Sequence, residues 1–111
     1  LPPRLVEREL KVTVVWPDGK PAAGASVRFE LNEGTSSGEI VKTEENGMAV
    51  IKLFDKYRYV VLAIGERREK DVHADPVEVI VGKDMKPLRF VLNHQGYGYE
   101  KVRAIKEKSP K

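Results

Sequence analysis

The most informative part of the chain is Gly19-Lys20-Pro21-Ala22-Ala23-Gly24-Ala25-Ser26-Val27, because it lies between two segments in which apolar and polar residues alternate. The preceding segment, 10–16, places Leu, Val, Val and Trp on one face. The following segment, 25–31, places Ala, Val, Phe and Leu on one face. Alternation with a period of two predicts strands that are buried on one side. The Pro17-Asp18-Gly19-Lys20 sequence predicts a turn, since Pro presets φ and Gly allows a positive φ.

The same pattern recurs along the chain about every 8–12 residues, with turn signals between the segments, as in β-sandwiches. Asn46-Gly47 is the strongest short hairpin signal. The loop expected at 33–38 is rich in Gly, Ser and Thr. We expect an all-β, seven-stranded antiparallel Greek-key β-sandwich. Beyond the two segments above, the expected strands are 39–44, 49–53, 57–64, 77–81 and 88–92, and 71–74 is a candidate for a further, short edge strand that ends before Pro76.

The bulk composition suits one soluble globular domain: 111 residues, of which 41% are hydrophobic and 33% are charged. The net charge is +3, from 20 basic and 17 acidic residues. The last nine residues carry four basic residues and one Glu, which is +3, so the remainder is near neutral and no nucleic-acid partner is expected. There is no cysteine, which excludes a disulfide scaffold and cysteine-based metal sites or nucleophiles. No apolar run reaches the roughly 18 residues of a membrane span.

The chain divides into three parts by composition. We interpret residues 1–7, which contain two prolines, as a linker, 8–94 as the sandwich, and 95–111 as a basic tail or linker or an added edge strand. The sequence begins with Leu rather than Met, which indicates a processed protein or, as we favour, a fragment of a larger one.

Four groups of residues resemble the carboxypeptidase regulatory-like domain, a member of the transthyretin-like (prealbumin-like) β-sandwiches, which are immunoglobulin-like in architecture. They are Asp18-Gly19-Lys20-Pro21, Gly24-Ala25-Ser26-Val27, Thr43 with Asn46-Gly47, and Leu53 with Tyr57, Tyr59 and Val60. The resemblance spans about residues 8–93 and departs from the family at the charged segment 65–70. It implies a non-catalytic module of a secreted, periplasmic or cell-surface protein, which supports or positions neighbouring domains or contacts another protein. Gly24 is expected to allow close backbone approach before a strand.

No residues form a convincing catalytic or cofactor site, so we expect no enzyme activity, cofactor or bound metal. His73 and Asp75 share a face of an extended segment, but two ligands do not hold zinc, and we interpret both, with His94, as surface residues. The serines lie in flexible segments or on an outward face. Glu44 and Glu45 flank a turn and are expected to be solvated. The Tyr-Arg-Gly-Ser ending of the transthyretin-like hydroxyisourate hydrolases is missing from this chain.

Two groups of residues are candidates for an interaction surface. Val60, Leu62 and Ile64 form an apolar row on the outward side of their strand, which either the tail segment 97–105 covers or a neighbouring domain contacts. Trp16, Tyr97 and Tyr99 are candidates for the alternative function, a carbohydrate-binding accessory module, although we favour Trp16 as a cap of the core because it continues the row of Val12 and Val14.

Overall fold

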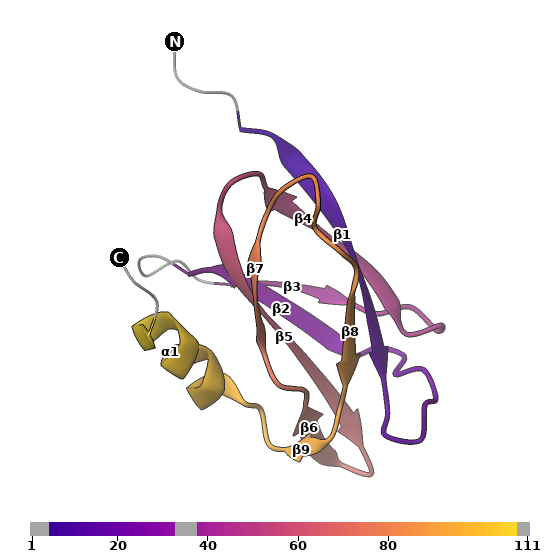
Figure 1. Ribbon diagram of the computed structural model, residues 1–111. Coiled ribbons are helices and arrows are strands. Elements are labelled where there is room, and N and C mark those ends of the chain that lie inside the picture. The colour runs from indigo at the N-terminus through magenta and orange to yellow at the C-terminus, as the bar shows by residue number, and fades with distance from the viewer. Residues whose placement is uncertain (1–4, 33–37, 109–111) are drawn as a thin grey trace.

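The computed structural model describes residues 5–32 and 38–108 of the chain, and within them two β-sheets pack together as an all-β sandwich (Figure 1). This confirms the predicted fold class. The three-stranded sheet has the order β4 (Met48–Phe54), β1 (Glu7–Val15), β8 (Leu88–Val91). The six-stranded sheet has the order β3 (Glu39–Lys42), β2 (Ser26–Leu31), β5 (Arg58–Arg67), β6 (Lys70–His73), β9 (His94–Gln95), and β7 (Val77–Ile80) also pairs with β5. Helix α1 (Tyr99–Lys108) follows β9.

Three parts of the sequence-based interpretation lie outside the described residues. They are the first four residues of the predicted linker, most of the predicted loop at 33–38, and the last three residues of the tail. Among the serines considered above, those at positions 36, 37 and 109 fall in these segments.

The core lies between the two sheets and consists of the predicted inward rows. Val12 and Val14 of β1, Ile51 of β4, and Val27 of β2 are fully buried there. Burial of each such side chain stabilises the fold by about 1.5–3 kcal/mol. On β5, Tyr59, Val61 and Ala63 face this core, and the intervening residues face the other side of the sheet. The period-two alternation therefore predicted the inward faces correctly.

Nine strands form in the described residues, rather than the seven expected. The long β5 pairs with two short strands in succession: its first half with β7 and its last residues with β6. The two-residue β9 then pairs with β6. The expectation of a purely antiparallel sandwich is also wrong in one place, because β1 and β8 run parallel, with Val12 opposite Leu88. Parallel neighbours need a long crossover connection, and here most of the chain separates the two strands.

The Asn46-Gly47 turn forms but does not close the expected hairpin. The amide of Gly47 donates to the carbonyl of Glu44 at 2.9 Å, and Gly47 has a φ of 76°. However, β3 before the turn pairs with β2, whereas β4 after it pairs with β1. The turn therefore carries the chain from one sheet to the other. A Cβ atom on Gly47 would lie 2.6 Å from the carbonyl oxygen of Val14, so the close backbone approach expected at Gly24 occurs here instead.

Gly24 serves a different purpose from the one expected. Its φ is 68°, but a Cβ atom there would meet nothing within 4 Å. Thr43 holds this turn in place: its side-chain hydroxyl donates to the carbonyl of Ala22 at 2.5 Å and accepts from the amide of Ala25 at 2.8 Å. Thr43 is itself buried, so the two hydrogen bonds replace those that the backbone groups would make with water.

Replacing Thr43 with Val should therefore lower the free energy of unfolding by about 2 kcal/mol, because a buried amide and a buried carbonyl each lose a partner. Chemical denaturation monitored by circular dichroism measures the change. Thr13→Val is the matched control, since Thr13 lies half-buried in β1 and the substitution should change stability by less than about 0.5 kcal/mol. Equal effects of the two substitutions would contradict the role assigned to Thr43.

The tail forms a helix, so the edge-strand alternative is wrong for the segment 97–105. Val102 and Ile105 are three residues apart and share the face that packs on the sheet. Glu100 lies in the first turn, and Lys106 and Lys108 lie in the last, which complements the helix dipole. In the described part of the tail, up to residue 108, only the end of β9 extends the sheet. Figure 1 shows α1 beside the outer side of the larger sheet, following β9.

Candidate binding surface

Val60, Leu62 and Ile64 are not an exposed partner surface, which corrects one of the two alternatives considered for them. Their exposed fractions are 1%, 1% and 8%, and they pack with Val102 of α1, itself 6% exposed. The other alternative, that the segment 97–105 covers this row, is confirmed. An apolar row on both sides of β5 needs a second cover, and α1 provides it.

Trp16 packs against the core, as we expected of a residue that caps it. The guanidinium of Arg67 lies 4.9 Å from the centre of the indole ring, and a carboxylate oxygen of Asp18 lies 3.2 Å from Arg67 Nη2. A Cβ atom on Gly65 would lie 3.2 Å from the Trp16 ring, so Gly65 leaves room for the indole. Because Arg67 covers the indole, Trp16 is a poor stacking platform for a ligand.

Tyr97 and Tyr99 form an exposed aromatic pair. Their rings are nearly parallel, with 3° between the planes and 5.6 Å between the centres, and their exposed fractions are 51% and 42%. The guanidinium of Arg28 lies 5.2 Å from the centre of the Tyr99 ring. Gly96 and Gly98, with φ of 89° and 79°, set the path of the chain on which the two tyrosines stand. The two rings are therefore held in place by stacking and by a neighbouring cation.

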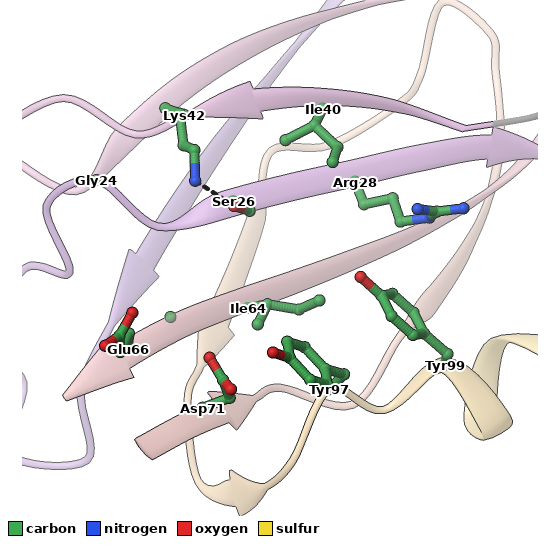
Figure 2. A pocket seen from close by; sticks show the side chains of 11 residues that line it. Gly24, Ser26, Arg28, Ile40, Lys42, Ile64, Glu66, Asp71, Tyr97 and Tyr99 are labelled. Atoms are coloured by element: carbon green, nitrogen blue, oxygen red, sulfur yellow. Dashed lines mark hydrogen bonds between the residues drawn. The ribbon is translucent and has the colours of Figure 1, made fainter. Parts of the chain in front are cut away.

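The two tyrosines border a shallow hollow of about 180 Å³ on the outer face of the larger sheet (Figure 2). Ile64 lies in its centre, and Lys42 reaches across to Ser26, to which it donates a hydrogen bond of 2.7 Å. The other residues that line the hollow are Gly24, Arg28, Ile40, Gly65, Glu66 and Asp71. We call Arg28, Ile40, Tyr97 and Tyr99 the tyrosine surface. Lys42 of β3 and the carboxylates of Glu66 in β5 and Asp71 in β6 lie around it.

Asp71 shifts the ionisation of Tyr97 at the edge of the hollow. A hydrogen bond with Asp71, together with its negative charge, raises the pKa of the Tyr97 hydroxyl above its usual range. The phenol donates to the carboxylate, and loss of its proton would place two negative charges side by side. Tyr97 therefore stays protonated to higher pH in the folded chain than in the unfolded chain. Its contribution to stability is present below about pH 10 and is lost as the pH rises through the folded value.

Replacing Asp71 with Asn should lower the pKa of Tyr97 towards that of a tyrosine in water, because the amide carries no charge. Ultraviolet absorbance during alkaline titration follows phenolate formation, and 13C-tyrosine NMR assigns it to Tyr97. Glu45→Gln is the control, since Glu45 is exposed in the turn before Gly47 and should leave the titration of Tyr97 unchanged. An unchanged pKa in the Asp71 variant would show that the hydrogen bond does not govern Tyr97.

The prediction that His73 is a surface residue is wrong. Its side chain is 2% exposed and lies against the ring of His94, with 5.3 Å between the ring centres. Asp75 is exposed, as expected, and contacts His94 and Lys101 rather than His73. No group of three or more His, Cys, Asp or Glu side chains in residues 5–32 and 38–108 is arranged to hold a metal ion. His73 and Asp75 therefore do not form the metal pair that the sequence left open.

Sequence reasoning identified both tyrosines but missed Arg28, Lys42 and Asp71. The pairing register of β2 and β3 shows how Arg28 and Lys42 come to lie at the hollow. Arg28 lies opposite Ile40, and Ser26 lies opposite Lys42, so these outward residues of β2 and β3 are neighbours. Directly opposed residues share a face of the sheet, and this pairing cannot be inferred from either strand alone.

No family model matches the chain, and no curated protein matches it at a significant level. The fold class therefore rests on the two packed sheets. Within the described ranges, no helix has the length and the apolar character needed to cross a bilayer.

Proposed function

We propose that this chain is a non-catalytic β-sandwich module of the carboxypeptidase regulatory-like kind, part of a larger exported protein, which contacts another protein through the tyrosine surface. The observation that carries the proposal is the stacked, half-exposed pair of Tyr97 and Tyr99 beside Arg28. The four groups of residues quoted above for the family resemblance support the choice of module.

The composition of the tyrosine surface is that of a contact site. Tyrosine and arginine are the residues that most often dominate the binding energy of protein interfaces. Both rings already lie in a fixed arrangement, so binding loses less side-chain entropy than it would with free rings. Exposed Ile40 adds apolar area next to Arg28. The charged side chains around the hollow orient a partner, because Lys42 and Arg28 favour acidic groups on one side and Glu66 and Asp71 favour basic groups on the other.

A displayed library of random peptides, selected on the immobilised chain, tests the proposal. Selected peptides should bind at least about tenfold more weakly to the Y97A/Y99A double variant, which corresponds to about 1.4 kcal/mol. Tyr57→Ala is the matched control: its ring is 42% exposed, the same fraction as that of Tyr99, but lies outside the hollow and packs edge-on against Phe54. Selection of no tyrosine-dependent peptide, or equal loss in the Tyr57 variant, argues against a protein contact here.

Carbohydrate binding is the second candidate, and the parallel orientation of the two rings favours it. A sugar stacks on a flat aromatic face, and its hydroxyl groups bind to carboxylate and hydroxyl side chains such as those of Asp71, Glu66 and Ser26. Titration with cell-wall and plant polysaccharides, followed by NMR of the backbone amides and the Ile64 methyl groups that line the hollow, tests this candidate. Saturable shifts that disappear in the Y97A/Y99A variant would mean that the partner is a glycan and not a protein. No shift at millimolar sugar would argue against carbohydrate binding.

A further inference from the structure

His73 and its neighbours form a joint where α1 meets the sheet. His73 projects from β6 and stacks on His94 of β9, with 30° between the ring planes. His94 Nε2 lies 3.2 Å from one carboxylate oxygen of Asp75, and Lys101 Nζ of α1 lies 3.0 Å from the other. The chain passes from this cluster through Gly96 and Gly98 to the tyrosine pair. The same few contacts therefore hold α1, β9 and the tyrosines together.

The hydrogen bonds of His73 define its proton positions. His73 Nδ1 lies 2.9 Å from the carbonyl oxygen of Gly96. A carbonyl oxygen only accepts, so Nδ1 carries the proton and a neutral ring leaves a lone pair on Nε2. Nε2 is buried, and no side chain or backbone group in the described residues is its hydrogen-bond partner. A Cβ atom on Gly98 would lie 2.4 Å from the ring and 2.8 Å from Nε2, so the backbone of Gly98 closes over this edge of the imidazole.

We propose that proton uptake by His73 opens this joint and releases α1 from the sheet at mildly acidic pH. The second proton on the ring must go to Nε2, where it would form a buried, charged N–H group with no acceptor. Such a group is strongly unfavourable in a protein interior. In the open form, water solvates the imidazolium, so acid favours the open form.

The charges on the surrounding elements do not offset this cost. Lys101 of α1 adds positive charge, and both Lys101 and His94 of β9 contact the carboxylate of Asp75, which lies between β6 and β7. Hydrogen bonds from Lys101 and then from His94 lower the pKa of Asp75 below its usual range, so Asp75 remains a carboxylate in mild acid. In the closed form this carboxylate contacts Lys101 and His94 and not His73 Nε2. Asp71 of β6 shares the face of His73 but accepts from Tyr97, and Glu66 of β5, opposite Asp71, is exposed.

Opening has two consequences. It uncovers Val60, Leu62 and Ile64, which α1 buries. It also moves Tyr97, which lies between Gly96 and Gly98, and Tyr99, which is the first residue of α1. The movement of the tyrosines changes ligand binding only if the tyrosine surface binds a partner, so this consequence rests on the proposed function. The opening of the joint does not rest on it.

The pH dependence follows from one proton. An imidazole in water takes up its second proton around pH 6.5. If only the open form binds this proton, the ratio of open to closed chains rises up to tenfold for each pH unit below about 6.5. At neutral pH the joint is closed and α1 is docked.

The test uses the whole chain without any ligand, so its outcome is independent of the proposed function. NMR follows the ring signals of His73 and the methyl signals of Val102 across roughly pH 8 to 5. The Val102 signals should move to those of an undocked helix as the His73 ring becomes charged, with the slope of one proton. Protonation of His73 while Val102 stays docked, or docking that does not change over this range, overturns the proposal.

Two variants identify the histidine responsible. His73→Phe keeps a planar ring but cannot take up a proton, so its open fraction should not change with pH. His94→Phe retains His73 and should keep the slope of one proton. If the His73→Phe chain retains the pH dependence of the natural chain, or if only His94→Phe removes it, His73 is not the group that opens the joint. If His73→Phe fails to fold, the NMR titration of His73 and Val102 in the unsubstituted chain still shows whether protonation of His73 and undocking of α1 occur together.

Discussion

Replacing Gly47 with Ala is expected to lower the free energy of unfolding by about 3 kcal/mol and the melting temperature by about 10 °C. Two effects add. An L-residue is strained at a φ of 76°, and the new methyl group would lie 2.6 Å from the carbonyl oxygen of Val14 and 3.0 Å from Pro21. The carbonyl of Gly47 accepts from the amide of Val14 at 2.8 Å, so the turn cannot move away without losing this bond between the turn and β1. Thermal unfolding followed by circular dichroism measures the change.

Gly24→Ala separates the two effects. Gly24 has a similar φ of 68°, but a Cβ atom there meets nothing within 4 Å, so only the backbone strain of about 1 kcal/mol remains. The difference between the two variants is the steric contribution at Gly47. If both substitutions destabilise equally, the close approach of the turn to β1 has no energetic importance, and the crossing between the sheets does not depend on a glycine at position 47.

Replacing Val102 with Asp is expected to release α1 from the sheet. Val102 is 6% exposed and packs on Val60, Leu62 and Ile64. Loss of this burial removes about 2 kcal/mol from the free energy that holds α1 on the sheet. In addition, a carboxylate is strongly unfavourable when it lies unpaired against an apolar row. The sandwich itself should stay folded, because the main core lies on the other side of β5. Binding of a fluorescent hydrophobic dye should rise several-fold as the apolar row becomes exposed.

Ala104→Asp is the control for charge and helix propensity, since Ala104 is exposed on the other side of α1. It introduces the same side chain into the same helix and should leave dye binding unchanged. A similar rise in both variants would mean that the helix is weakened by the aspartate rather than undocked by the loss of Val102. No rise in either variant would mean that the burial by Val102 does not hold α1 in place.

The sandwich and its inward rows were predictable because alternation is a local property. Val12, Ile51 and Val61 face the core for the same reason: each occupies an apolar position in a segment of period two. The apolar row on the far side of β5 also indicated correctly that something must cover it. The helical form of this cover was missed because Tyr97, Tyr99 and Val102 were interpreted as an extension of a sheet edge, whereas the helix period rests on Val102 and Ile105 alone.

The candidate site was only half predictable. Tyr97 and Tyr99 were identified as exposed aromatics, but their partners Arg28 and Asp71 lie on β2 and β6, far away in the sequence. His73 was assigned to the surface because His73 and Asp75 alone cannot hold zinc, so no metal site gave the imidazole a reason to be buried. Its burial depends on Gly98 and His94, which arrive from the other end of the chain.

Local patterns were enough to predict the positions of β1 to β8, their inward faces and the turns between them, because these follow from side-chain alternation and from the backbone preferences of glycine and proline within a few residues. The pairing of the strands, the crossing of the Asn46-Gly47 turn between the sheets and the parallel run of β1 and β8 became visible in the tertiary structure alone. It also decided the burial of His73 and the hollow beside the tyrosines. These features depend on the pairing register and on contacts between distant segments, which no local pattern encodes.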